Sequence, residues 1–239
     1  GLGLAPGVAF GADGNEDVFR NEVLYAEQLF AQRFGMRGRT LTLLNHPQTT
    51  DALPLATLSN LRLALTGMAS RMDRGEDFLV LFLTTHGTED HQLYVDLQPL
   101  PLDWITPDDL RTSLDEAGID WRVVIVSACY SGGFVESLAT PMSLVITAAR
   151  ADRPSFGCGA DADITYFGRA FLTEALNQNP NVSMPDLGTA LVELVDHGGA
   201  HHLGDEAERT DGHDDGRQHE VPGRGERAAA AELGARVSL

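Results

Sequence analysis

A chain of 239 residues is long enough for one large domain with a sizeable hydrophobic core. Its formal net charge of −18 argues against nucleic acid and anionic lipid as partners, because 35 acidic residues outweigh 17 basic ones. Two cysteines are too few for a disulfide-stapled scaffold or a cysteine-rich zinc site, so we expect no metal and no cofactor.

The first part of the chain alternates between short apolar runs and amphipathic segments. This pattern predicts strands at 7–11, 39–44 and 78–84, and helices at 16–34 and 58–72. The run at 78–83 is the longest uninterrupted apolar run, and with six residues it is too short to span a bilayer. Continuous apolar runs of this kind are typical of strands that are buried on both faces.

The same alternation continues after the strand at 78–84. Residues 90–97 are expected to form a small hairpin or an extended arm over the site. Further strands are predicted at 121–127 and 143–148, and helices at 106–118, 164–176 and 186–195. The alternation indicates an α/β fold, a mostly parallel sheet with helices on both faces and right-handed crossovers. Residues 1–197 are expected to form this one domain.

The end of the chain has a different composition. Residues 198–239 contain no aromatic residue and no sustained apolar period, which indicates either a disordered tail or a shifted reading frame in the source sequence. The histidines of this region are not expected to bind a metal in a flexible segment: His201, His202, His213 and His219. The chain begins with Gly1, so any upstream signal or membrane segment lies outside it.

Two neighbouring predicted strands end in residues that can do nucleophilic chemistry. His86 and Gly87 follow the strand at 78–84, and Cys129 follows the strand at 121–127. The carboxyl ends of parallel strands line the crevice in which ligands bind. A thiol beside an imidazole is the minimum set for covalent catalysis, with Cys129 as nucleophile and His86 as general acid and base. The amides of Gly87 and Cys129 are candidates for an oxyanion hole.

Each of these residues also has a structural interpretation. A lone cysteine is often a small buried hydrophobe, and a lone histidine is often structural. His91 is a rival general base, although its polar surroundings favour a surface position. Cys158 is interpreted as a packing or loop thiol, because no strand with a histidine precedes it.

The motifs His86-Gly87 and Ser127-Ala128-Cys129-Tyr130-Ser131-Gly132 together resemble the legumain-like cysteine peptidases, family C13 of the caspase-like clan. The similarity continues at 146–149 and 155–158 and covers roughly residues 7–196. It is greatest to short bacterial members. The resemblance implies a caspase-like three-layer sandwich and a bacterial source, with a parent chain that is exported or attached to a membrane.

The resemblance also implies an endopeptidase that cuts after Asn, sometimes Asp, in a peptide or protein substrate. Members use a histidine as general acid and base and a cysteine as nucleophile, which assigns these roles to His86 and Cys129. Arg20 and Ser155 match pocket residues of the family, and Asp161 or Asp163 could supply a carboxylate. Each of these residues also has an ordinary interpretation. Arg20 would be a solvent-exposed helix residue, Ser155 a turn residue, and the two aspartates part of a helix N-terminus.

The chain departs from the family at two positions. Ser127 stands where legumains carry a pocket glutamate, and Val18 stands where they place an asparagine near the catalytic histidine. Both departures bear on how strict the preference for Asn can be. Ser127 nevertheless belongs to the expected substrate-binding set, because it lies two residues before the nucleophile.

Three other functions compete with an endopeptidase. A transamidase or ligase would use the same thioester with an amine in place of water. A non-catalytic caspase-like interaction module is a second alternative, although degenerate members usually lose the cysteine or histidine. A nucleotide-binding fold would suit the alternation of elements, but residues 11–14 do not form a glycine-rich phosphate loop.

Overall fold

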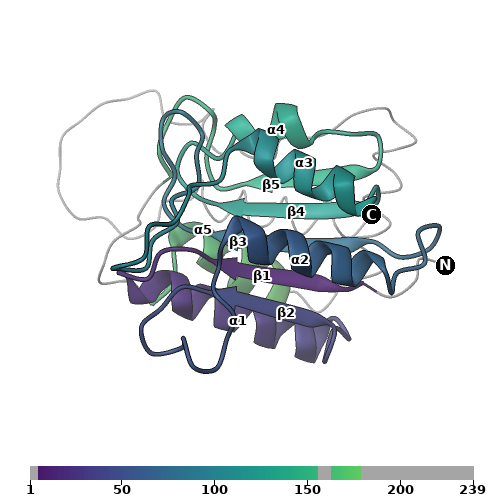
Figure 1. Cartoon of the computed structure of the whole chain (residues 1–239), viewed down its shortest axis with the longest axis horizontal. Coiled ribbons are helices and arrows are strands. Elements are labelled where there is room, and N and C mark those ends of the chain that lie inside the picture. Colours follow the sequence, from purple (N-terminus) through teal and green to yellow (C-terminus); the bar gives the residue numbers. More distant parts are fainter. Residues whose placement is uncertain (1–4, 156–162, 179–239) are drawn as a thin grey trace.

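The computed structural model describes residues 5–155 and 163–178, and the core of this part is a parallel β-sheet. Its strands are β1 (Gly7–Gly11), β2 (Thr40–Leu44), β3 (Leu79–Thr84), β4 (Arg122–Ser127) and β5 (Ser143–Thr147). Their order across the sheet is β2-β1-β3-β4-β5, and every pair is parallel. The two strands that precede His86 and Cys129 are therefore neighbours in the middle of the sheet (Figure 1).

Helices cover both faces of the sheet. They are α1 (Asp17–Arg33), α2 (Leu58–Ala69), α3 (Pro107–Ala117), α4 (Gly133–Leu138), the short α5 (Tyr166–Gly168) and the π-helix η1 (Arg169–Asn177). Side chains of α2, α3 and α4 pack in one apolar cluster, while side chains of α1 and η1 pack in the other. The result is the predicted three-layer α/β sandwich (Figure 1).

Local sequence explains where these helices begin and end. Thr106 caps α3 through a reciprocal capping box with Asp109, and Pro107 occupies the first helical turn. The helix ends at Gly118, which adopts a left-handed conformation with φ of +69°. This start and this stop are the ones that the sequence predicts.

The structure also differs from the sequence prediction in places. Helix α4 is absent from the prediction, because six residues are too few to show a helical period. The helix predicted at 164–176 is present, but it starts at Tyr166 and continues as a π-helix to Asn177. The predicted helix at 186–195, the tail at 198–239 and Cys158 lie outside the described residues.

The segment between β3 and α3 forms the predicted arm. Isolated β-bridges pair Leu93 with both Gly87 and Ile105, and a further bridge joins Asp96 to Asp13. The arm therefore folds back over the carboxyl ends of the strands. Among the described residues, no helix is both long and apolar enough to cross a membrane.

Candidate active site

The strands β3 and β4 bring the positions of His86 and Cys129 side by side. Thr84 is paired with Ser127 in the sheet, so His86 and Cys129 each lie two residues beyond a paired position. Alternate residues of a strand face the same side of the sheet. Val80 and Phe82 of β3 and Val123 and Ile125 of β4 belong to the same apolar cluster, under α1 and η1. This alternation directs Thr84 and Ser127, the last strand residues before the two candidate positions, to the face that α1 covers.

Gly87 is in close contact with the backbone of Cys129. A Cβ atom added to Gly87 would overlap the carbonyl oxygen of Cys129 and would lie 3.2 Å from its amide nitrogen. Only glycine leaves room for such an approach. The glycine that follows His86 thus allows the chain after β3 to pack directly against the cysteine. Cys129 itself is partly exposed.

His86 is held by the start of α1. Its Nε2 lies 2.9 Å from Oε1 of Glu16 and 3.8 Å from Oδ2 of Asp13. The ring of Phe19 packs edge-on against the imidazole at 4.9 Å between centroids, and Tyr94 of the arm lies on another side at 6.4 Å. Two carboxylates and two aromatic rings therefore fix the orientation of the imidazole.

Asp13 is itself fixed by a small polar network. Its Oδ1 accepts hydrogen bonds from the backbone and side-chain amides of Asn15, at 2.8 and 2.9 Å. The same Asn15 side chain donates to Asp96 of the arm at 2.6 Å. Asp13, Glu16 and His86 offer three ligand atoms within 4.8 Å of one another, which could also accommodate a cation. The hydrogen bond between His86 and Glu16 explains why these side chains lie together without a bound cation.

These two carboxylates are not predicted from the sequence as partners of the histidine. Asp13 appears in the sequence as a turn residue and Glu16 as the start of a helix. The available signal was their position directly after β1, since β1 is the neighbour of β3 in the sheet. Val18, the residue expected at the asparagine position of the family, is a buried core residue.

The turn after Cys129 is tightly bonded. Tyr130 adopts a positive φ of 54°, and its amide donates to the carbonyl of Arg153 at 3.1 Å. The buried hydroxyl of Ser131 accepts a hydrogen bond from the amide of Ala149 at 3.1 Å. A non-glycine residue in this conformation is uncommon and needs such support. The chain after β5 thereby braces the cysteine turn.

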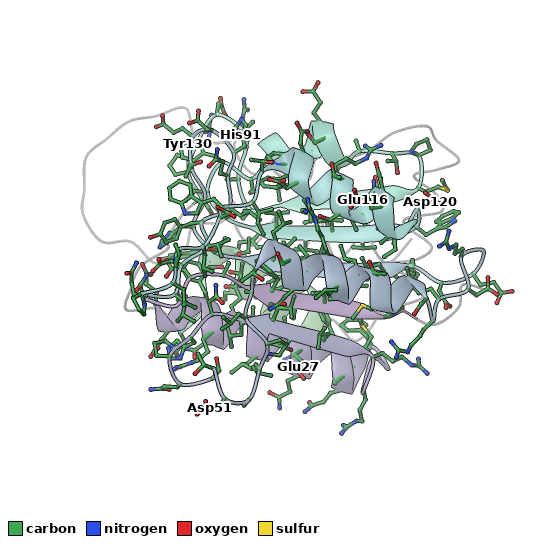
Figure 2. The ribbon with its side chains drawn as sticks, in the orientation of Figure 1. Glu27, Asp51, His91, Glu116, Asp120 and Tyr130 are labelled. Atoms are coloured by element: carbon green, nitrogen blue, oxygen red, sulfur yellow. The ribbon has the colours of Figure 1, made fainter. Side chains whose placement is uncertain are left out.

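His91, the rival base, belongs to this turn rather than to the surface alone. Its Nδ1 lies 3.1 Å from the carbonyl oxygen of Tyr130, to which it donates. The hydroxyl of Tyr130 in turn donates to Glu89 of the arm at 3.2 Å. Figure 2 shows His91 and Tyr130 close together at the carboxyl end of the sheet, far from Glu116 and Asp120 at the other end.

Arg20, a predicted substrate-binding residue, is engaged on the β2 side of the sheet. Its guanidinium forms an ion pair with Asp17 at 3.1 Å and donates to Gln48 at 2.9 Å. It also lies 3.2 Å from Nε2 of His46. Its donors are therefore already used by side chains of α1 and of the loop that follows β2.

The other predicted pocket residues lie at the end of β4 and in the chain after β5. Ser127 is buried at the end of β4, with its hydroxyl 3.3 Å from that of Thr165. Ser155 is partly buried, and Asp163 is exposed two residues before Thr165, while Asp161 lies outside the described residues. Ser127 and the start of α5 therefore meet, whereas no contact among the described residues links Arg20 to them.

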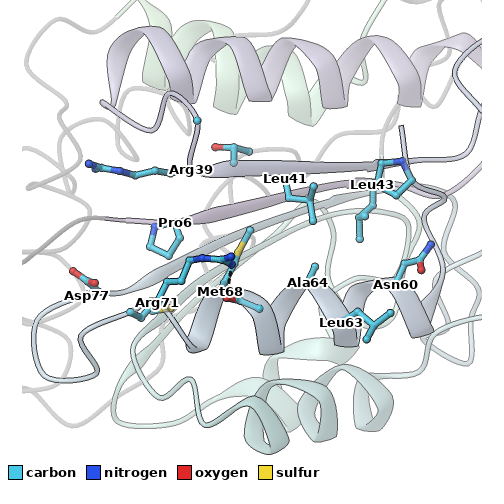
Figure 3. A pocket seen from close by; sticks show the side chains of 15 residues that line it. Pro6, Arg39, Leu41, Leu43, Asn60, Leu63, Ala64, Met68, Arg71 and Asp77 are labelled. Atoms are coloured by element: carbon cyan, nitrogen blue, oxygen red, sulfur yellow. Dashed lines mark hydrogen bonds between the residues drawn. The ribbon is translucent and has the colours of Figure 1, made fainter. Parts of the chain in front are cut away.

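A separate groove of about 700 Å³ lies along the outer edge of β2, between that strand and α2 (Figure 3). Its walls are mainly apolar and include Leu41, Leu63 and Met68, with Arg39 and Arg71 at one end. The strand β2 is separated from β3 by β1. This groove is therefore distinct from the site of His86 and Cys129, which do not line it.

Comparisons with known proteins agree with this geometry. A family model described as the peptidase C13 family matches residues 58–189, which is more than half of the chain and includes both His86 and Cys129. The crystal structure of caspase-1 from Spodoptera frugiperda is similar at a TM-score of 0.50 and 15% sequence identity, over 80% of this chain and 74% of that chain. At this identity the likeness shows the fold alone. No curated protein sequence matches the chain.

Proposed function

Because this chain belongs to the peptidase C13 family, with its caspase-like fold, we propose that it is a cysteine endopeptidase that acts through Cys129 and His86. The observation that supports this most directly is the register of β3 and β4, which sets both residues two positions past the paired Thr84 and Ser127. The contact of Gly87 with the Cys129 backbone supports the same arrangement.

The first half of the proposed reaction forms a thioester. His86 takes the thiol proton of Cys129, and the sulfur attacks the scissile carbonyl carbon. The carbon–nitrogen bond then breaks as His86 gives that proton to the leaving amine. In the second half, His86 takes a proton from water, and the resulting hydroxide attacks the thioester. The carbon–sulfur bond breaks, the acid product leaves, and His86 returns its proton to the sulfur, which restores both residues.

The proposed oxyanion hole consists of the amides of Gly87 and Cys129. Among the described residues, no acceptor is recorded for the Gly87 amide. The bridge between Gly87 and Leu93 is formed by bonds of their neighbours, from Tyr94 to His86 and from Thr88 to Gln92, so the Gly87 amide points away from Leu93. Preorganised amides of this kind stabilise the negative oxygen that develops in the transition state.

In this mechanism Glu16 is a positioning residue for the base. When Nε2 of His86 donates to Glu16, Nδ1 is the ring nitrogen that exchanges protons with substrate and water. A carboxylate in this position fixes the tautomer and the orientation of the imidazole. Glu16 would thus replace, with a different residue, the asparagine that the family places near its histidine.

Glu16→Ala is expected to lower kcat by roughly 10- to 100-fold, because the imidazole loses the group that orients it. In Glu16→Gln, kcat is expected to fall less, because the side-chain oxygen of the glutamine can still accept a hydrogen bond from Nε2 of His86. Steady-state kinetics on one cleaved peptide measure both. Glu116→Gln, an exposed change at the far end of the molecule, is the matched control (Figure 2). Equal kcat in Glu16→Ala and wild type would remove Glu16 from the mechanism.

The proposed specificity is cleavage after Asn, or after Asp. It comes from the family resemblance, and Ser127, Ser155, Asp163 and Arg20 are the proposed substrate-binding residues. The hydroxyl of Ser127 lies 3.3 Å from that of Thr165, which supports a position of Ser127 near the chain that carries Asp163. The bonds of Arg20 to Asp17 and Gln48 would have to be exchanged for Arg20 to take part.

A peptide library with a varied residue before the scissile bond tests the function. The purified protein is incubated with the library with and without prior alkylation of its thiols, and products are identified by mass spectrometry. Cleavage after Asn or Asp that alkylation abolishes is the expected result. Joined peptides in the presence of an added amine would favour a ligase. No product from any member of the library would favour a non-catalytic module.

A further inference from the structure

The carboxyl group of Glu22 is buried behind the ends of the two strands that carry the proposed nucleophile and base. Glu22 lies on α1 and has no exposed surface. Its Oε2 accepts a hydrogen bond from the amide of Thr165 at 2.8 Å. The hydroxyls of Thr84 on β3 and Ser127 on β4 also face the carboxyl group. One side chain thus touches three separate elements at the base of the site.

The start of α5 is shaped to receive this carboxyl group. A Cβ atom added to Gly168 would lie 2.6 Å from Cδ of Glu22, so a larger residue there would displace the acid. Thr165 caps α5 by accepting from the amide of Gly168 at 2.9 Å, and its hydroxyl lies 3.3 Å from that of Ser127. Glu22, Thr165 and Ser127 therefore form one buried polar cluster.

The second oxygen of Glu22 indicates which form of the acid is present. Oε1 is buried without a hydrogen bond of good geometry, and so is Oγ1 of Thr84, which faces the same group. A neutral carboxylic acid carries a hydroxyl that can donate to Thr84, which would satisfy both atoms. The groups that face Glu22 are the hydroxyls of Thr84, Ser127 and Thr165, and none of them carries a compensating charge.

We propose that Glu22 is a positioning residue of this peptidase, a buried neutral acid that fastens the start of α5 to the ends of β3 and β4. The proposal rests on the proposed function, because it gives Glu22 a role in the site of Cys129. Asp163, a predicted substrate-binding residue, lies two residues before the fastened Thr165. Ser127 lies two residues before the cysteine. Glu22 therefore couples the substrate side of the site to its nucleophile.

This arrangement gives a signature in pH. Burial raises the pKa of Glu22 above its ordinary value of 4.5, and the hydroxyls of Thr165, Ser127 and Thr84 only partly oppose the shift. Above pH 4.5 the unfolded chain gives up this proton while the folded protein keeps it. The contribution to stability is therefore complete below that pH and is lost as pH rises through the raised pKa.

Three variants test the proposal: Glu22→Gln, Glu22→Ala and, as a control on the same helix, Glu27→Ala (Figure 2). Glu22→Ala is expected to raise KM for a cleaved peptide roughly 10- to 100-fold, with a smaller loss of kcat, because misplacement by about 1 Å has effects of this size. Glu22→Gln keeps the shape and the donor of a neutral acid, so its KM is expected to stay within about three-fold of wild type.

Two further measurements do not require peptidase activity. The rate at which iodoacetamide alkylates Cys129, followed by mass spectrometry of its peptide, is expected to change in Glu22→Ala and not in Glu22→Gln or Glu27→Ala. Thermal unfolding of wild type is expected to show a midpoint that falls as pH rises above 4.5, relative to Glu22→Gln.

These readouts separate a failure of this inference from a failure of the proposed function. If wild type cleaves no peptide, the proposed function fails, while alkylation and unfolding still decide the role of Glu22. If Glu22→Ala folds and keeps the KM and the alkylation rate of wild type, the role of Glu22 is purely structural. If KM and the alkylation rate changed as much in Glu22→Gln as in Glu22→Ala, the proposal that Glu22 acts as a neutral acid would be wrong.

Discussion

Cys129→Ala is expected to lower peptide cleavage by at least about 10³-fold, because the variant loses the sulfur that is proposed to form the thioester. The stability of the fold should change little, since the side chain is only partly buried and loses a single atom. Cleavage is measured as product formed per folded molecule, with the peptide that the library identifies as best.

The chain contains a matched control for this prediction. Cys158 is the other cysteine, and the sequence gives it no histidine-bearing neighbour strand, so Cys158→Ala is expected to keep wild-type activity. If Cys129→Ala cleaved at the wild-type rate, the assignment of the nucleophile would be wrong. If Cys158→Ala were the inactive variant, the site would have to be sought elsewhere in the fold.

Gly87→Ala is expected to lower kcat/KM by about 10²-fold and to destabilise the fold by roughly 1–3 kcal/mol. The added methyl group would overlap the carbonyl oxygen of Cys129 and press on its carbonyl carbon at 2.9 Å. Backbone atoms on both sides must then move apart, which displaces the proposed nucleophile from the base and widens the proposed oxyanion hole. Kinetics and thermal unfolding of the same preparation measure the two effects.

Gly75→Ala is the control for the loss of a glycine. A Cβ atom added there meets only Oδ1 of Asp73, at an ordinary distance of 3.5 Å in an exposed turn. Both activity and unfolding are expected to stay close to wild type. Wild-type activity in Gly87→Ala would mean that the chain after β3 does not need to approach Cys129 as closely as it does here.

The strands and their succession along the chain were predictable, because each strand is marked by an apolar run in its own sequence. The apolar runs at 78–83 and 123–126 are continuous, and polar residues follow both of them. Since parallel strands present their carboxyl ends at one edge, the juxtaposition of His86 and Cys129 followed from the topology. The family signature increased the weight of that prediction.

The partners of these residues were not predictable in the same way. Glu16 reaches His86 only because β1 lies next to β3, a pairing between segments about 70 residues apart. Glu22 had a readable signal, since it shares the apolar face of α1 with Phe19, Val23 and Ala26. A carboxylic acid on the apolar face of a helix is rarely buried without a partner, so its presence there indicates a functional role. The π-helix η1 had no readable signal in the sequence. Its hydrogen bonds differ from those of an α-helix by one residue in spacing, and this difference leaves no mark in the amino-acid composition.

The attachment of both proposed reacting groups to adjoining strands has an evolutionary consequence. Neighbouring strands are held about 4.8 Å apart by main-chain hydrogen bonds, whatever their side chains are. The spacing of the reacting pair is therefore insulated from drift in the helices and loops that surround it. The insect caspase shares this fold at 15% sequence identity, so the frame of parallel strands tolerates wide divergence in sequence.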